Sequence, residues 1–336
     1  MKQIKFNLYL PSWNFTKTRE HALLAEEMGF YSVSFGDHFY MNITQGGSVG
    51  QTASTPNLEC YTALAAVASI TKRVKLLTAV TPIGFRNPAV LGKITATLDH
   101  ISEGRLIVGL GSGWQRSEYE AYNLPFASAA VRLRELEDAI KLLKVMWTDP
   151  EPTYHGTDFA IDKAYNFPQP TQKPYPPIMV GGGGKNVIQI AGRHADILSL
   201  VPRNPGGGSE LHRSVTFARK DFRERVELFY DTARAAGRDP SKLEVSTLSY
   251  MLMSRDKSQA DQMLAASAQE AQTDLETTRQ ALTYVSGTPA EVRREIRSRY
   301  EELDLSYFSF YFSSREMLKT FAQEVIPEFA APPDQR

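Results

Sequence analysis

Short segments rich in apolar and β-branched residues alternate with amphipathic helices along this 336-residue chain. Some of these segments, such as Leu106-Ile-Val-Gly-Leu110, contain no polar side chain at all. Strands without a polar face are typical of parallel sheets that are covered on both sides. The alternation therefore predicts an α/β protein built on a parallel sheet. The predicted strands comprise residues 4–10, 31–35, 74–80, 105–110, 177–180, 195–201, 243–249 and 307–312.

A continuous series of eight strands and helices favours a (β/α)8 TIM barrel that forms one domain over residues 1–336. A doubly wound open sheet is the competing architecture. Three segments interrupt the repeat and are expected to be insertions, near residues 40–56, 150–176 and 202–213. The second is too rich in proline to be one regular element. The third contains three consecutive glycines, and we expect it to act as a lid over a site.

The charge composition narrows the partners that this chain can bind. The 38 Lys and Arg residues balance 38 Asp and Glu residues, so a general nucleic-acid-binding function is not expected. No run approaches the ~18 apolar residues of a membrane span, and the N-terminus lacks the apolar core of a secretory signal. The single cysteine, Cys60, excludes an internal disulfide. We expect a cytoplasmic protein whose partner is a small-molecule substrate, without nucleic acid or membrane.

Unusual residues gather where the predicted strands end. Asp37-His38 follows the second strand, and residues 78–81 (Thr-Ala-Val-Thr) end the third. Residues 111–114 (Gly-Ser-Gly-Trp) follow the fourth, and residues 181–184, four glycines, follow the fifth. In a TIM barrel the active site lies at this C-terminal edge of the strands. We therefore expect the functional site at this rim.

The two glycine clusters have different interpretations. Gly109-Leu-Gly-Ser-Gly113 resembles half of a dinucleotide fingerprint, but Trp114 occupies its last glycine position, and a tight strand-to-helix connection is the plainer interpretation. In the second cluster, Gly181–Gly184 precedes Lys185-Asn186 at the start of a predicted helix. Bare amides at a positive helix end are typical of a phosphate site. A turn without a ligand is the alternative.

His38 is the candidate proton-transfer residue. A lone histidine is usually structural, but one beside Asp37 at a strand end can exchange protons near neutral pH. The other five histidines show no metal-ligand spacing, so no metal site is expected. No candidate for nucleophilic catalysis is present, since Cys60 lies in an apolar helix and no nucleophile elbow occurs.

Several segments together resemble the bacterial luciferase-like flavin and deazaflavin oxidoreductases. They occur in the family's order, over about residues 4–196, with a weaker match to the end of the chain. The segments are residues 34–39 (Ser-Phe-Gly-Asp-His-Phe), 85–88 (Phe-Arg-Asn-Pro), 96–105 (Ala-Thr-Leu-Asp-His-Ile-Ser-Glu-Gly-Arg), 109–114 (Gly-Leu-Gly-Ser-Gly-Trp) with Glu118-Tyr119, and 177–184 (Pro-Ile-Met-Val-Gly-Gly-Gly-Gly).

The resemblance implies a flavin or deazaflavin lying across the barrel mouth, above a non-prolyl cis peptide that maps to Ala79–Val80. It implies that the phosphate of the cofactor tail binds at Gly182, Gly183 and Gly184. Asp37-His38 is most similar to the coenzyme F420 branch, in which the aligned histidine handles a proton. Trp114 replaces a glutamate that some of those enzymes use as proton donor, so oxidation of a glucose phosphate is not expected. The residues expected to contact the cofactor are Asp37, Thr78, Ala79, Val80, Gly113, Trp114, Gln115, Gly182, Gly183 and Gly184.

These observations lead to an expected oxidoreductase that transfers a hydride between coenzyme F420 and a small organic substrate, with His38 and Asp37 as catalytic residues. One alternative is an FMN-dependent monooxygenase that uses oxygen and a separate flavin reductase. A flavin-free binding protein on the same barrel is another. Residues 58–70 and 91–98 are apolar enough to form a homodimer interface. Five aromatic residues either line a substrate pocket or belong to the core: Tyr9, Trp13, Phe39, Tyr40 and Phe85.

Overall fold

Eight parallel strands close into a barrel in the computed structural model, which describes residues 2–42, 54–202 and 217–330. Their order around the barrel is β1-β2-β5-β7-β10-β11-β12-β14, and β14 pairs with β1 to close it. Each strand lies at one of the eight predicted segments, which confirms the barrel over the open sheet. The barrel strands are β1 (Lys5–Tyr9), β2 (Ser32–Phe35), β5 (Lys75–Thr78), β7 (Leu106–Gly111), β10 (Ile178–Gly181), β11 (Ile197–Leu200), β12 (Glu244–Met253) and β14 (Leu305–Phe312).

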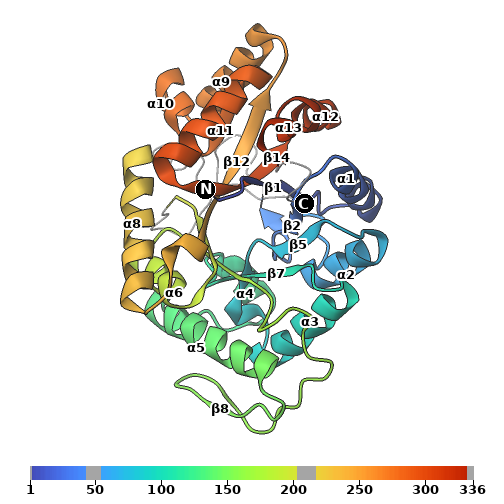
Figure 1. Ribbon diagram of the computed structural model, residues 1–336, viewed down its shortest axis with the longest axis vertical. Coiled ribbons are helices and arrows are strands. Elements are labelled where there is room, and N and C mark those ends of the chain that lie inside the picture. Colours follow the sequence, from blue (N-terminus) through green and yellow to red (C-terminus); the bar gives the residue numbers. More distant parts are fainter. Residues whose placement is uncertain (1, 43–53, 203–216, 331–336) are drawn as a thin grey trace.

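Helices surround the barrel, as Figure 1 shows. Their apolar side chains pack with those of the strands in one large buried cluster. Each of the eight barrel strands is followed by at least one helix before the next barrel strand begins or the described chain ends. The helices are α1 (Phe15–Glu27), α2 (Cys60–Ile70), α3 (Pro88–Ile101), α4 (Arg116–Ala121), α5 (Ala129–Thr148), α6 (Lys185–His194), α8 (Arg219–Ala235), α9 (Lys257–Glu270), α10 (Leu275–Gln280), α11 (Pro289–Leu303), α12 (Arg315–Glu324) and α13 (Ile326–Phe329), with short 3-10 turns η2 (Ile83–Phe85) and η3 (Pro240–Lys242).

The interior of the barrel has an apolar layer toward the N-terminal ends of the strands and a polar layer nearer the mouth. The apolar layer is a separate buried cluster of Leu77, Ile107, Met179, Ile197 and Tyr307. Above it, Asn7 donates to the hydroxyls of Ser34 (2.8 Å) and Ser309 (3.2 Å). Ser32 in turn donates to Asn7 Oδ1 at 2.7 Å and bonds the Tyr307 hydroxyl at 2.6 Å. This Asn7 network joins β1, β2 and β14 across the seam where the barrel closes.

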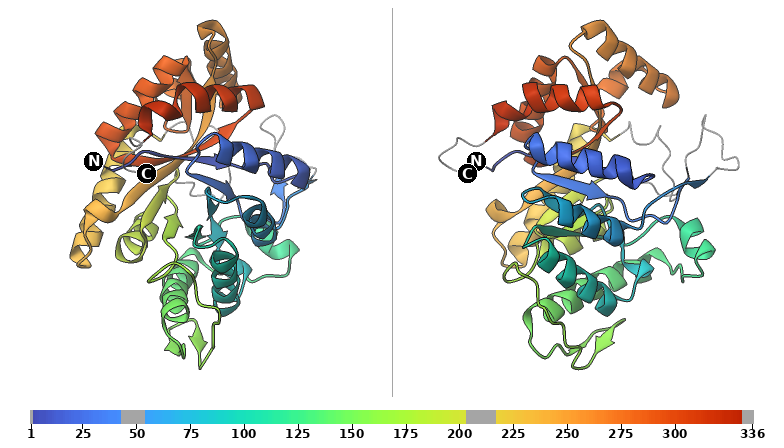
Figure 2. Two further views of the ribbon diagram at one scale, coloured as in Figure 1. Left: turned by 45° about the vertical axis from the view of Figure 1, so that its right-hand side comes forward. Right: turned by 90° about the vertical axis from the view of Figure 1, so that its right-hand side faces the viewer.

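One excursion was not predicted. Between β12 and β14 the chain forms α9, α10 and a further parallel strand, β13 (Tyr284–Gly287), which pairs with the upper half of β12. In the right-hand view of Figure 2 the helices of this excursion project beyond the rest of the barrel. The segment lacks a long apolar run, and its strand is only four residues long. Periodicity therefore gave no signal for it.

The predicted insertions are described only in part. Near residues 150–176 the chain forms an antiparallel pair, β8 (Tyr154–His155) and β9 (Ala160–Ile161), held by Asp138 through the Tyr154 hydroxyl at 2.5 Å. The insertion near residues 40–56 contributes β3 (Met41–Asn42) and β4 (Ser54–Thr55), and its centre lies outside the described residues. The expected lid near 202–213 lies almost entirely outside them. The short strand β6 (Thr81–Pro82) continues from β5 and pairs with the end of β7.

Candidate active site

Glycines line one side of the barrel mouth. Side chains alternate between the two faces of a strand, so residues two and four positions beyond the inward-facing Ile107 also face inward. On β7 these positions are Gly109 and Gly111, and on β10 the residue two beyond the inward-facing Met179 is Gly181. We call these three residues the glycine arc.

Steric limits explain why the glycine arc carries no side chains. A Cβ on Gly109 would lie 1.7 Å from the Thr78 carbonyl oxygen, and one on Gly111 would lie 2.8 Å from Val80 Cγ2. Gly181 meets the same Val80 side chain at 3.0 Å. The glycines of the Gly109–Gly113 motif thus leave room for the end of β5. This packing supports the interpretation of the motif as a tight strand-to-helix connection over that of a dinucleotide fingerprint. The Ala79–Val80 peptide at this point is cis, as the resemblance implied.

Thr78, which was expected to line the cofactor, is fully buried in the barrel wall. Its hydroxyl donates to the Gly109 carbonyl at 2.9 Å and accepts from the Gly109 amide at 2.8 Å. Both of these bonds hold β5 to β7. Ala79 and Val80 are partly exposed beside it, so they remain the better placed of the three to contact a cofactor.

Gly182, Gly183 and Gly184 form an open cradle at the start of α6. The Gly182 amide donates to the Ser199 carbonyl at 3.0 Å, and a Cβ on Gly182 would lie 2.7 Å from Val187 Cγ1. Gly184 caps α6 without a side-chain bond, and nothing lies within 4 Å of where its Cβ would be. No described residue accepts a hydrogen bond from the amides of Gly183 or Gly184. An open helix N-terminus of this kind suits an anionic group such as a phosphate.

Gln115 adds a buried donor at the other end of the glycine arc. Its side chain is 8% exposed, and its Nε2 has no hydrogen-bond partner in the described part of the chain. Buried donors without partners are rare in folded proteins because each costs roughly 1–3 kcal/mol. A cofactor that offers an acceptor at this point satisfies the amide. Together with the open cradle, this orphaned donor fits a flavin or deazaflavin with a phosphorylated tail.

Asp37 faces away from the barrel axis and forms a buried ion pair with Arg86. Its carboxylate is joined to the guanidinium by two hydrogen bonds, of 2.5 and 3.1 Å. Burial raises the pKa of Asp37, and the Arg86 charge opposes this effect. Arg86 also bonds Glu59 and lies 4.8 Å from the centre of the Tyr61 ring. Because both carboxylate oxygens are engaged, this geometry suits a residue that fixes the end of β2, and direct cofactor contact by Asp37 remains a prediction.

His38 is held by a carboxylate that was not singled out as a site residue. Its Nδ1 lies 2.7 Å from Oε2 of Glu118, a fully buried residue of α4. The other oxygen, Oε1, accepts from the Phe39 amide at 2.7 Å, so Glu118 acts as an acceptor on both sides. The Trp114 ring, 41% exposed, stands edge-on to the imidazole with ring centres 5.8 Å apart. In the sequence, Glu118 is marked by its place in the Glu118-Tyr119 pair, which matches the family and follows the glycine-rich turn.

Tyrosines line the opposite side of the mouth. The register pairs Tyr250 with both Tyr311 and Tyr284, and the pairing of β1 with β14 places Tyr9 beside Tyr311. The ring centres are 4.2 Å apart for Tyr9 and Tyr311, 5.2 Å for Tyr311 and Tyr250, and 5.9 Å for Tyr250 and Tyr284. We call these four residues the tyrosine arc; its last member, Tyr284, is 4% exposed and is buried with Ala271 and Ala281. Of the aromatic residues expected at a pocket, Tyr9 belongs to this arc, whereas Phe39 and Phe85 stack on each other next to Glu118's helix.

The tyrosine arc meets His38 at Gly36. The Tyr9 ring packs against the Tyr311 ring, with ring centres 4.2 Å apart, and its hydroxyl lies against Gly36. A Cβ on Gly36 would lie 1.9 Å from that hydroxyl and 3.5 Å from His38 Cδ2. The Cδ2 atom of His38 therefore lies near the Tyr9 hydroxyl, and no described residue bonds Nε2. The His38 imidazole thus lies between the glycine arc and the tyrosine arc.

The molecule is a closed (β/α)8 barrel whose mouth carries a glycine cradle suited to a phosphate and a histidine held by a carboxylate. These features are typical of the class of cofactor-dependent barrel enzymes. The chain belongs to the luciferase-like monooxygenase family, whose sequence profile matches residues 6–306. This family contains both F420-dependent and FMN-dependent oxidoreductases, as the relatives below illustrate.

Three sequence relatives show the range of the family. The chain is 33% identical over 228 residues to an uncharacterized protein of Mycobacterium tuberculosis, covering 65% of this chain and 74% of that protein. It is 32% identical to an F420-dependent glucose-6-phosphate dehydrogenase of Amycolatopsis mediterranei, over 57% of this chain and 54% of the enzyme. It is 31% identical to an FMNH2-dependent dimethylsulfone monooxygenase of Pseudomonas putida, over 55% of this chain and 48% of the enzyme. The matches to the two named enzymes thus span about half of each.

Solved structures share the whole fold. An F420-dependent secondary alcohol dehydrogenase, solved with an F420-acetone adduct, superposes with a TM-score of 0.77 at 21% identity, covering 98% of this chain and 100% of that one. The monooxygenase RslO1 from Streptomyces bottropensis superposes with a TM-score of 0.74 at 24% identity, covering 97% and 100%. At these identities the likeness concerns the fold alone.

Two further properties concern the described residues as a whole. Over residues 2–42, 54–202 and 217–330, no helix is both long and apolar enough to cross a membrane. In the same ranges, no three His, Cys, Asp or Glu side chains come together as a metal-binding group.

Proposed function

We propose that this protein transfers a hydride between coenzyme F420 and a small organic substrate, with His38 moving the accompanying proton. The observation that carries the proposal is the His38–Glu118 pair, in which Nδ1 lies 2.7 Å from the carboxylate and Nε2 has no partner among the described residues. A proton-transfer group at this place suits the interconversion of an alcohol and a carbonyl compound. An oxygen-activating flavin site has less need of it.

The glycine arc and its neighbours would hold the cofactor. When bound, the deazaflavin ring supplies the hydride acceptor or donor. Ala79, Val80 and Trp114 would contact the ring, Gln115 would donate its unpaired amide hydrogen, and Gly182, Gly183 and Gly184 would bind the tail phosphate. Asp37 would act indirectly, since its ion pair with Arg86 fixes the strand end from which His38 projects.

Glu118 selects the tautomer of His38. Because its Oε1 already accepts from the Phe39 amide, Oε2 is the natural acceptor for an Nδ1–H of the imidazole. Nε2 then carries the lone pair and can take a proton from a substrate hydroxyl, or return it in the reverse direction. The buried carboxylate also stabilises the imidazolium that this transfer forms.

Cofactor binding tests the proposal directly. Purified protein is titrated separately with F420 and with FMN, and ring fluorescence is followed. We expect F420 to bind. Its ring has a carbon in place of the flavin N5, which suits the two-electron hydride transfer that we propose. Binding of FMN alone would support the alternative of a monooxygenase fed by a separate reductase, for which the dimethylsulfone relative is a precedent. Binding of neither would support a flavin-free binding protein.

The variant His38→Ala separates binding from chemistry. We expect it to keep the F420 affinity of the wild type and to lose at least about 100-fold in turnover, the usual contribution of a positioned acid or base. Turnover is followed by F420 absorbance with a panel of secondary alcohols and carbonyl compounds. Unchanged turnover would remove His38 from the mechanism.

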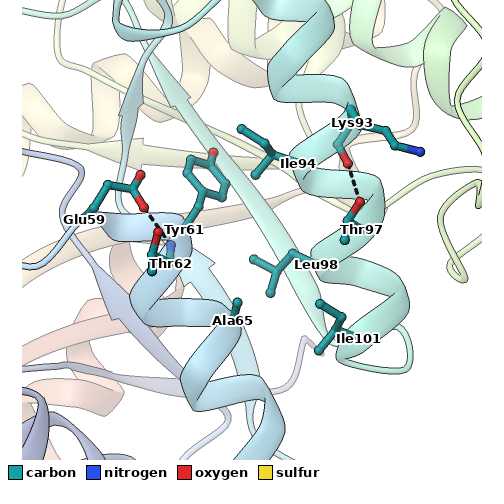
Figure 3. Close-up of a pocket in the computed structure, with 9 residues that line it drawn as sticks. All are labelled: Glu59, Tyr61, Thr62, Ala65, Lys93, Ile94, Thr97, Leu98 and Ile101. Carbon is teal, nitrogen blue, oxygen red and sulfur yellow. Dashed lines mark hydrogen bonds between the residues drawn. The ribbon is translucent and has the colours of Figure 1, made fainter.

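We also propose that two copies of the chain form a homodimer through α2 and α3. A groove of about 420 Å³ runs between these helices, and Figure 3 shows apolar side chains of both helices along it. At its edge Ile101 is 45% exposed, and on the same helix Val90 is 55% exposed. Ile101→Arg should shift the sedimentation of the protein from dimer to monomer. A cytoplasmic location also remains part of the proposal.

A further inference from the structure

We propose that the tyrosine arc is a binding platform for a neutral, planar aromatic substrate; this inference names the substrate class of the function proposed above and rests on it. The four rings come from four strands, β1, β14, β12 and β13. Tyr9, Tyr311 and Tyr250 stand at the barrel mouth, whereas Tyr284 is 4% exposed and is buried with Ala271 and Ala281. The rings begin beside His38, where the Tyr9 hydroxyl lies against Gly36. A ligand that lies on them therefore reaches the proton-transfer residue.

The rings of the arc are fixed in place. Tyr9 packs between the Tyr311 ring, 4.2 Å away between ring centres, and Gly36, where a Cβ would lie 1.9 Å from the Tyr9 hydroxyl. Tyr250 stands between Tyr311 and Tyr284, because β14 and β13 flank β12 on opposite sides. A rigid aromatic surface binds a flat ligand with little loss of side-chain entropy.

The geometry of Tyr250 indicates how the ligand is held. Tyr311 stacks on it, with ring centres 5.2 Å apart and 19° between the planes, and Tyr284 lies tilted beside it at 5.9 Å, yet 42% of the residue is exposed. Part of the Tyr250 side chain is therefore open to a ligand at the mouth. Ring edges carry the positive part of the aromatic quadrupole, and they attract the negative π-face of another aromatic ring. The platform thus favours a ligand with a flat π-face over a saturated ligand of the same size.

The electrostatics of the arc favour a neutral ligand. On β12, β14 and β1 the inward-facing residues at the mouth are Leu248, Tyr250, Tyr311 and Tyr9, none of which is cationic. The charged side chain that acts on the pKa of both Tyr250 and Tyr284 is Glu270, a carboxylate. Burial raises the pKa of Tyr9, Tyr250 and Tyr311, so these rings stay neutral at physiological pH. Among these described residues a phosphorylated sugar would find no positive partner.

Calorimetric titration with matched probes tests the platform. The aromatic probe is 1-(2-naphthyl)ethanol, its saturated counterpart is 1-(2-decalinyl)ethanol, and glucose 6-phosphate is the anionic probe. We expect the wild type to bind the naphthyl compound about three- to tenfold more tightly than the decalinyl compound, and glucose 6-phosphate not at all. Equal affinity for the naphthyl and decalinyl compounds, or preferred binding of glucose 6-phosphate, would overturn the inference.

Substitutions assign the selectivity to one residue. Tyr250→Leu should weaken naphthyl binding about three- to tenfold and leave decalinyl binding nearly unchanged, whereas Tyr250→Phe should retain the preference. The matched control is Tyr165→Leu, since Tyr165 is 59% exposed and lies in the β8–β9 insertion. Circular dichroism checks that each variant is folded, and the selectivity of the wild type tests the platform even where a variant is not.

The F420 titration on the same preparation separates the two proposals. Protein that binds F420 but does not prefer the naphthyl probe overturns the aromatic platform and leaves the proposed function standing. Protein that binds neither F420 nor FMN, but shows the Tyr250-dependent preference, overturns the proposed function and keeps the aromatic site.

Discussion

The two sides of the barrel mouth are built on opposite principles. In the glycine arc the side chains are absent because backbone and Val80 atoms already occupy the space, with 1.7 Å between a Gly109 Cβ and the Thr78 carbonyl. In the tyrosine arc four large rings fill the corresponding positions and support one another at 4.2 to 5.9 Å. One side therefore offers a flat backbone surface, and the other offers shaped aromatic edges.

The difference separates two tasks that a cofactor-dependent barrel has to perform. A flat surface bordered by a buried donor and by two amides that no described residue bonds suits a large planar cofactor with an anionic tail. A surface of fixed side chains can be changed residue by residue to suit a substrate. His38 lies where the two meet, within reach of both.

The largest effect should come from breaking the glycine arc. Gly109→Ala places a methyl group against the backbone of β5, which has no free space to move, so we expect a loss of about 3 kcal/mol or more in the free energy of unfolding. Denaturant unfolding measures it. Gly184→Ala is the comparison variant: nothing lies within 4 Å of its Cβ, so it should cost only the loss of a glycine at a helix N-cap, about 1 kcal/mol or less. Equal stability of the two variants would contradict the packing role of the arc.

A smaller effect is expected at the boundary of the two arcs. Glu118→Gln removes the carboxylate that orients His38 and stabilises its protonated form, so turnover should fall about tenfold or more while F420 affinity stays unchanged. Glu120→Gln, an exposed position on the same helix, is the control and should behave as the wild type. Steady-state kinetics and fluorescence titration give the two quantities. If both variants lose the same turnover, Glu118 has no special relation to His38.

The smallest effect concerns the tyrosine arc at alkaline pH. Burial raises the pKa of Tyr9 and Tyr311 above the ordinary value near 10, so the folded state holds these protons more tightly than the unfolded chain does. Their stabilisation is complete below about pH 10 and is lost as the pH rises, by up to about 1.4 kcal/mol per pH unit for each tyrosine.

The double variant Tyr9→Phe/Tyr311→Phe cannot ionise at these positions. Its free energy of unfolding should therefore fall less steeply than that of the wild type between pH 9 and 11, as measured by denaturant unfolding at each pH. Parallel curves for the two proteins would show that the rings ionise freely in the folded state.

The sequence predicted the barrel because its information is local. Each strand is an apolar run such as Leu106–Leu110, and each run can be recognised without knowing its neighbours. The rim residues Asp37, His38, Trp114 and Gly182–Gly184 followed from the strand ends, and the Ala79–Val80 cis peptide followed from the family resemblance.

What could not be predicted depends on contacts between distant segments. Glu118 and His38 are 80 positions apart, and only the folded barrel brings them to hydrogen-bonding distance. The tyrosine arc depends on the register of β1, β12, β13 and β14, which a single sequence does not specify, and β13 itself lacked a periodic signal. The steric role of Gly109 likewise depends on Thr78, a residue of another strand.

The Asn7 network below the mouth has a consequence for how the barrel closes. It joins the first strand to the last, through a bond between Asn7 and Ser309 that spans 302 positions. A shift of β14 by one residue against β1 would turn Ser309 outward and leave buried hydroxyl and amide groups without partners. A wrongly aligned final strand would therefore lower the stability of the closed barrel. The polar groups of the Asn7 network thus specify one alignment of the first strand with the last.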